Sequence, residues 1–206
     1  MNRPLAALTG IAVIAGVTLL GFGGWQLANP TPNDAPTSER RAVAPSEVAP
    51  LPPAAVPHAL TIPALGFQSE VFEFQTGGAP ELNPPDAERA YWLSDYGLPG
   101  AGSDNTVYLI GHTSADGRAV FDPLVDREAQ HSRVLPGDEI WLETATGTVV
   151  YETIAVERHE RQRLADVDNV WTTAPGRLVL VTCFFEASTD TVSDNLVVFA
   201  RALNDE

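Results

Sequence analysis

The sequence contains a single thiol, and an imidazole occupies a matching place earlier in the chain. Cys183 ends the apolar run 178–183, and His112 ends a second apolar run that begins at Val107. The two residues are 71 positions apart. A thiolate is a strong nucleophile, and a neighbouring imidazole can favour the thiolate and then protonate a leaving group. Cys183 and His112 are therefore a candidate nucleophile and proton-transfer group, provided that two strands bring their ends together.

Both residues also have an ordinary structural interpretation. A free Cys is most often an inert, small core residue, and a His at a strand end can be one whose hydrogen bonds are simply satisfied. The other histidines, His58, His131 and His159, lie in polar or linker segments with no evident partner. Because no spacing typical of three or four metal ligands occurs, we predict neither a metal nor a cofactor.

The first 28 residues have the composition of a membrane anchor. Residues 5–28 carry no charge over 24 positions, which is enough for a helix across a hydrocarbon core of about 30 Å. A cleaved signal peptide is the alternative, but its apolar region would be about 7–15 residues and would need a cleavage site of small residues that is not visible here. Arg3 is the only charged side chain before the apolar stretch, so we expect a cytoplasmic N-terminus and an extracellular remainder.

The remainder divides into a linker and one domain. Residues 29–57 are rich in Pro, Ala and Ser, which predicts an extended extracellular linker. Residues 58–206 have the length of a single ordinary domain. All 27 acidic residues but only 11 of the 12 basic ones follow residue 28, so this part has a formal charge of −16. That charge excludes nucleic-acid binding and argues against docking on anionic lipid.

Strand patterns dominate the domain, and helical patterns are short. Apolar and polar residues alternate in some segments, while others are continuous apolar runs that predict central strands buried on both faces. The alternating segments are 67–74, 140–143 and, more loosely, 149–156, and the continuous runs are 107–111, 178–183 and 196–200. We predict short helices near 86–92 and 121–128. The pattern indicates a mainly β barrel or sandwich with small helical insertions.

Five segments resemble, in order, the landmarks of a sortase domain. They are residues 59–66, 107–113, 135–140, 178–183 and 196–200. The N-terminal anchor and the Gly-His-Thr and Val-Thr-Cys-Phe sequences are similar to actinobacterial class E and class F sortases. The resemblance implies an eight-stranded β-barrel and a cysteine transpeptidase. Such an enzyme cleaves a Leu-Pro-x-Thr-Gly-like sorting signal and joins the cleaved protein to an amine of the cell envelope.

The resemblance also implies roles and partners. Cys183 would form a thioacyl intermediate and His112 would transfer the proton, while Thr182, Thr113 and Trp171 would contact the substrate. The segment 158–176 would form one wall of the groove for the sorting signal, although Trp171 can equally be a packing residue on the barrel. The partners would be surface proteins with a sorting signal and a peptidoglycan precursor or another amine acceptor.

One position departs from the sortase pattern. Sortases carry an Arg at the start of the strand that follows the Cys, and this chain has Asn195 there. An Asn amide can donate a hydrogen bond to an oxyanion, although without charge. Alternatively, Asn195 is a turn residue that opens the strand. Arg201 follows the strand and is expected at its far end, so a replacement cation would come from Arg118, Arg158, Arg161 or Arg163.

Two competing functions follow from this departure and from the thiol itself. The first is a sortase-like protein that binds sorting signals but turns them over weakly or not at all, because the usual Arg is missing. The second is a cysteine peptidase whose acceptor is water rather than an amine. The sequence leaves both alternatives open.

Overall fold

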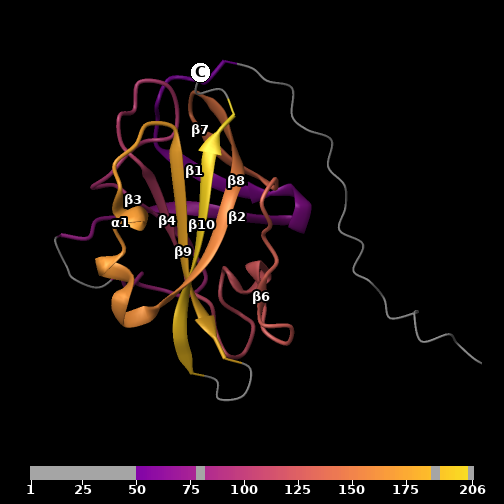
Figure 1. Cartoon of the computed structure of the whole chain (residues 1–206). Coiled ribbons are helices and arrows are strands. Elements are labelled where there is room, and N and C mark those ends of the chain that lie inside the picture. Colours follow the sequence, from indigo (N-terminus) through magenta and orange to yellow (C-terminus); the bar gives the residue numbers. More distant parts are fainter. Residues whose placement is uncertain (1–49, 78–81, 187–190, 204–206) are drawn as a thin grey trace, which may run out of the picture. The chain divides into compact units, whose positions relative to one another are not determined.

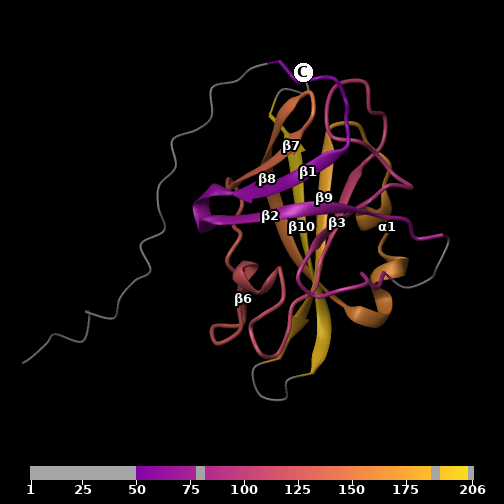
Figure 2. The same ribbon diagram turned by 180° about the vertical axis from the view of Figure 1, so that it is seen from behind.

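The computed structural model describes residues 50–77, 82–186 and 191–203. Eight strands close into a barrel in the order β1-β2-β3-β4-β9-β10-β8-β7 (Figures 1 and 2). Their bounds are β1 Pro57–Ile62, β2 Phe67–Phe74, β3 Ala90–Leu93, β4 Val107–Ile110, β7 Glu139–Thr144, β8 Gly147–Glu160, β9 Arg177–Phe185 and β10 Val192–Ala202. The predicted eight-stranded barrel is confirmed.

The pairing of the strands determines which side chains meet. The β2–β3 and β4–β9 pairs are parallel, and the other six pairs of the barrel are antiparallel. Parallel neighbours end at the same edge of a sheet, because their carboxyl ends point in the same direction. The β4–β9 pair therefore brings the ends of two apolar runs, 107–111 and 178–183, to one edge of the barrel.

Both faces of the central strands are buried, as the continuous apolar runs predicted. Along β9, Leu178 and Leu180 belong to the core inside the barrel, whereas Val179 and Val181 belong to a second cluster on its outer face. The connection between β8 and β9 covers this outer cluster, and it contains the 3₁₀ helix η3 (Arg161–Asp166) and the short helix α1 (Asp168–Trp171). Figure 1 shows this connection beside the barrel.

The prediction of a helix over residues 86–92 is wrong. Bends precede Ala90, and Ala90–Leu93 form β3, which pairs with β2 on one side and with β4 on the other. Aromatic residues such as Tyr91 and Trp92 fit a pleated surface well, and two available partner strands override a weak helical preference. Over residues 121–128 the helix is reduced to η2 (Asp122–Leu124), and β5 (Val125–Asp126) follows and pairs with β6 (His131–Ser132). A further 3₁₀ turn, η1 (Pro63–Leu65), joins β1 to β2.

The last part of the predicted linker is attached to the barrel. The Ala54 amide donates to the Ala101 carbonyl at 3.0 Å, and the Ala101 amide donates to the Pro52 carbonyl at 2.7 Å. The predicted membrane anchor and the linker up to residue 49 lie outside the described residues. Within the part of the chain that the structure describes, no helix is long and apolar enough to span a membrane. The domain boundaries at 28 and 57 stay predictions.

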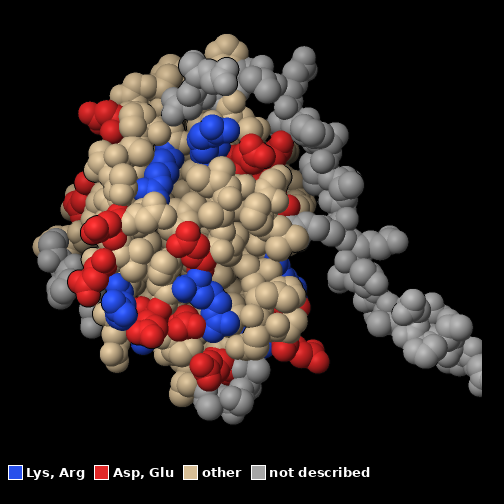
Figure 3. Space-filling view, in the orientation of Figure 1, with Lys and Arg blue, Asp and Glu red and all other residues tan. Residues whose placement is uncertain are grey.

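Acidic and basic side chains are mixed on the described surface. On the face shown in Figure 3, Arg side chains lie among Asp and Glu side chains rather than in one continuous basic patch. Ion pairs among the described residues include Arg89 with Asp86 and Arg158 with Asp194. This arrangement agrees with the acidic composition of the domain.

Candidate active site

Cys183 lies on β9, and His112 follows the last residue of β4 by two positions. The parallel register pairs Val107 with Leu178 and Ile110 with Val181, an offset of 71 residues. Continued two residues beyond the last of these pairs, the same offset places His112 beside Cys183, and the hydrogen bond from the Thr113 hydroxyl to the Cys183 carbonyl agrees with this placement. The spacing of 71 positions in the sequence is therefore the register of the β4–β9 pair. The structure brings the predicted nucleophile and the predicted proton-transfer group together.

Two threonine hydroxyls hold the ends of β4 and β9 against each other. The Thr182 hydroxyl donates to the Gly111 carbonyl at 2.8 Å, and the Thr113 hydroxyl donates to the Cys183 carbonyl at 2.7 Å. Both side chains are buried, at 2% and 7% exposure. A substrate contact by Thr182 or Thr113 stays a prediction. In the structure both hydroxyls donate to backbone carbonyls on either side of the Cys183–His112 pair, and these bonds position that pair.

His112 is held from two further directions. Its Nε2 lies 3.0 Å from the Pro84 carbonyl, which can only accept, so the proton in this contact is on the imidazole. The His112 carbonyl accepts from the Phe121 amide at 2.9 Å. A side chain at Gly111 would meet the Phe121 ring at 2.6 Å, which explains why glycine precedes the histidine. The Phe121 loop therefore packs directly on the backbone that carries His112.

The surroundings of Cys183 act on its thiol in two opposing ways. Burial, the larger effect, raises the pKa of Cys183 above its ordinary value, because the thiolate loses solvation. The positive charge of Arg161 acts in the other direction and lowers the same pKa. No hydrogen bond joins Cys183 to His112 among the described residues. Catalytic hydrogen bonds commonly tighten only when substrate is bound.

Asn195 lies directly across from Cys183 on β10. The antiparallel register of β9 and β10 pairs the two residues, so their side chains are on the same face with Cβ atoms about 4.5–5.5 Å apart. Asn195 is 7% exposed, and its amide makes no hydrogen bond to any described residue. The interpretation of Asn195 as a turn residue that opens the strand is wrong, because β10 already begins at Val192. An unpartnered amide next to the thiol is available to a substrate oxygen.

Two of the four candidate cations are engaged elsewhere. Arg118 is exposed and pairs with Asp116, and this hydrogen bonding lowers the pKa of the Asp116 carboxyl to about 2. Arg158 donates to Asp194 at 3.0 and 2.5 Å and lies 3.9 Å over the Phe184 ring. It pairs with Leu196, so its side chain points to the face opposite Asn195.

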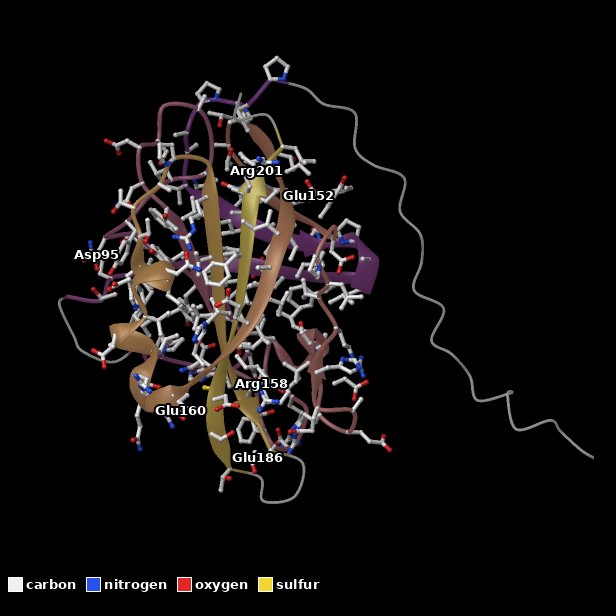
Figure 4. The ribbon with its side chains drawn as sticks, viewed as in Figure 1. Asp95, Glu152, Arg158, Glu160, Glu186 and Arg201 are labelled. Atoms are coloured by element: carbon white, nitrogen blue, oxygen red, sulfur yellow. The ribbon has the colours of Figure 1, made fainter. Side chains whose placement is uncertain are left out.

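Arg161 and Arg163 remain, and both belong to η3. Arg201 is excluded by its position, since Figure 4 shows it at the opposite end of the barrel from Arg158 and Glu160. Of the described arginines, Arg161 is the one whose charge acts on the Cys183 thiol.

His159 is a further neighbour of the site that was not expected from the sequence. On β8, His159 pairs with Asn195, so Cys183, Asn195 and His159 form one row across three adjacent strands on the same face. The His159 ring nitrogen Nε2 donates to the Glu157 carboxylate at 2.8 Å. A His and a Glu two positions apart share a face when they lie on one strand, but the predicted strand ended at residue 156, whereas β8 extends to Glu160.

Two aromatic residues, Trp171 and Phe184, pack against the protein. Trp171 stacks on Tyr108 of β4 with ring centres 5.3 Å apart, and its indole donates to the Leu164 carbonyl at 2.9 Å. Phe184 is fully buried. A direct substrate contact by Trp171 stays a prediction, whereas its packing role is explicit. A shallow hollow on β2, lined by Phe67, Gln68, Ser69, Glu70, Phe72, Glu88, Arg89 and Val120, contains none of the candidate residues.

Solved sortases share this barrel. Sortase C1 from Streptococcus suis is 17% identical with a TM-score of 0.53, over 73% of this chain and 74% of that chain. A lid mutant of sortase A from Corynebacterium diphtheriae is 19% identical with a TM-score of 0.52, over 77% and 74%. Sortase C-1 from Actinomyces oris is 19% identical with a TM-score of 0.50, over 70% and 72%. No protein-family profile and no curated protein matches the sequence. The structural likeness establishes the sortase fold for this chain.

Proposed function

We propose that this sortase-fold chain is a membrane-anchored extracellular cysteine transpeptidase. It cleaves a C-terminal sorting signal of Leu-Pro-x-Thr-Gly type and joins the cleaved protein to an amine of the cell envelope. The observation that carries the proposal is the β4–β9 register, which sets His112 beside Cys183, with the free Asn195 amide opposite the thiol. The narrower similarity to class E or class F sortases rests on sequence motifs alone and stays a prediction.

The first half of the reaction uses all three side chains. His112 takes the proton of the Cys183 thiol, and the resulting thiolate attacks the carbonyl carbon of the scissile peptide bond. A C–S bond forms, and the carbonyl π electrons move to the oxygen. The Asn195 amide N–H donates to this oxyanion. When the oxyanion collapses, the C–N bond breaks, and the His112 imidazolium gives its proton to the departing amine. A thioester on Cys183 remains.

The second half reverses these steps with a different amine. A deprotonated amine of the envelope attacks the thioester carbonyl, and His112 takes the proton that the amine loses as the new amide forms. The C–S bond breaks and the thiolate of Cys183 is regenerated. With water as the acceptor the same steps release a free carboxylate, which is the reaction of the alternative peptidase.

The function is tested by incubating the full chain in detergent micelles with labelled sorting peptides and a panel of amines. We expect a thioacyl adduct on Cys183 in the intact mass of the protein and a peptide–amine conjugate in the mass of the product. A carboxylate product alone, with amine in excess, would identify a peptidase. Peptide binding with neither adduct nor product would identify a sorting-signal binding protein. Either result would overturn the transpeptidase proposal.

The proposed topology predicts a specific proteolytic fragment. Trypsin cleaves after Arg and Lys, this chain has no Lys, and the predicted linker contains the pair Arg40-Arg41. Trypsin added to intact cells should therefore release the domain by cutting after these residues, since proline-rich linkers are exposed. Western blotting and mass measurement of the medium identify the fragment.

A double variant provides the control for this experiment. Replacing Arg40 and Arg41 by Gln should leave the domain attached to the cells under the same treatment. If trypsin leaves the unaltered chain intact under conditions that cleave a known surface protein, the domain lies on the cytoplasmic side of the membrane. That result would contradict the proposed location.

A further inference from the structure

We propose that Arg161 supplies the positive charge of the Cys183 site. This charge comes from the 3₁₀ helix η3 beside the barrel, whereas β10, the strand that pairs with Cys183, carries the neutral Asn195. The expected effect of Arg161 on catalysis rests on the proposed function. Its expected effect on the Cys183 thiol is a property of the free protein and does not depend on that function.

The fold places Arg161 next to the row of site residues. The last pairs between β10 and β8 are Asn195 with His159 and Asp194 with Glu160, so Arg161 is the residue that directly follows this end of the sheet. Figure 4 shows Glu160 at the same end of the barrel as Arg158. The row Cys183–Asn195–His159 thus leads along the sheet to the strand end from which η3 departs.

Packing of η3 directs it over the face that carries Cys183. Leu164 belongs to the outer cluster together with Val181 and Val197. Val181 precedes Cys183 by two residues on β9 and Val197 follows Asn195 by two residues on β10, so all four side chains project from the same face. The Trp171 indole donates to the Leu164 carbonyl and fixes this turn of η3 in place.

Arg161 is uncommitted, unlike the arginines around it. Among the described residues it has no ion pair or hydrogen bond, whereas Arg158 is bound to Asp194 and Arg118 to Asp116. Its charge acts on the thiol against the effect of burial. Because the thiol lies in a poorly solvated place, a nearby charge has a stronger effect there than it would have in water.

Other titratable groups also surround Cys183 and must be separated from Arg161 in any test. His112 follows β4 on one side, and His159 with its partner Glu157 lies on β8 on the other. Asp194 and Glu160 project from the opposite face of the sheet. A change of pH alone would titrate several of these groups. The test must therefore replace Arg161 and leave the other titratable residues unchanged.

A guanidinium at this place would act at two stages of acyl transfer. Before attack it favours the thiolate over the thiol. After attack, the electron pair moves from sulfur through the new C–S bond to the carbonyl oxygen, and the same positive charge stabilises the oxyanion together with the neutral Asn195 amide. Separate residues would thus provide the charge and the hydrogen bond that a single Arg provides on the strand.

The test measures the pH dependence of Cys183 alkylation by iodoacetamide in the full chain. The variants are Arg161→Lys, Arg161→Gln and Arg161→Glu, and Arg163→Gln is the matched control from the same turn. We expect the midpoint of the pH profile to be higher in Arg161→Gln than in the native chain, and higher still in Arg161→Glu. The midpoints of Arg161→Lys and Arg163→Gln should stay near the native value. At 1 M salt, where the screening length is about 3 Å, the differences in midpoint between these variants and the native chain should become smaller.

The alkylation profile separates this proposal from the proposed function, since alkylation needs neither peptide nor amine. For acylation by a sorting peptide we expect Arg161→Gln to be slower by about fivefold to tenfold, less than for a fully buried donor because Arg161 is exposed. The role of Arg161 would be overturned if Arg161→Gln and Arg161→Glu both keep the native alkylation midpoint while they unfold at the same temperature as the native chain. A shifted midpoint in a chain that transfers no peptide would support it and reject the transpeptidase.

Discussion

Replacing Cys183 by Ala is expected to abolish both the thioacyl adduct and peptide transfer, while the barrel stays folded. The substitution removes one sulfur atom at the end of β9, where the side chain is only partly buried, so we expect a loss of stability of about 1 kcal/mol or less. The adduct is measured by intact mass after incubation with a sorting peptide, and folding by thermal unfolding.

Cys183→Ser provides a matched control that keeps the size and the polarity of the side chain. A hydroxyl is far less ionised than a thiol at the same pH, so this variant should also be inactive while retaining native stability. Transfer at a native rate by folded Cys183→Ala protein would remove the nucleophile from the proposal, and the fold alone would then say nothing about chemistry.

Replacing Asn195 by Ala is expected to slow acylation by about 10²–10³-fold, as removal of other single oxyanion donors does. The amide has no hydrogen-bond partner among the described residues, so its removal breaks no contact that stabilises the fold. Burst or single-turnover kinetics with a sorting peptide separate acylation from the later transfer step.

Two further substitutions at this position distinguish a hydrogen-bond donor from a space-filling residue. Asn195→Asp keeps the shape but adds a negative charge beside the thiol, so acylation should fall at least as far as in the Ala variant. Asn195→Arg should match or exceed the native rate, because it adds a charged donor across from Cys183. A rate within threefold of native for Asn195→Ala would reject the donor role and leave Arg161 as the remaining side-chain candidate.

The strands that the sequence predicted correctly came from local patterns. Continuous apolar runs predicted β4 and the body of β9 and β10 as strands buried on both faces, because strand periodicity and the burial of apolar side chains act over a few residues. β3 was missed for the same reason. Its sequence around Tyr91 and Trp92 is short, and only the available edges of β2 and β4 make it a strand.

What the sequence determined by itself was the chemistry available to the protein: one thiol and one imidazole at the ends of apolar strands, and an Asn where an Arg would be expected. The tertiary structure decided which of these groups meet. The β4–β9 register sets His112 beside Cys183, the β9–β10 register turns Asn195 toward the thiol, and the packing of η3 selects Arg161 over Arg158. The reason is that registers and face assignments depend on contacts between distant segments in the closed barrel, whereas sequence patterns report only the local periodicity of each strand.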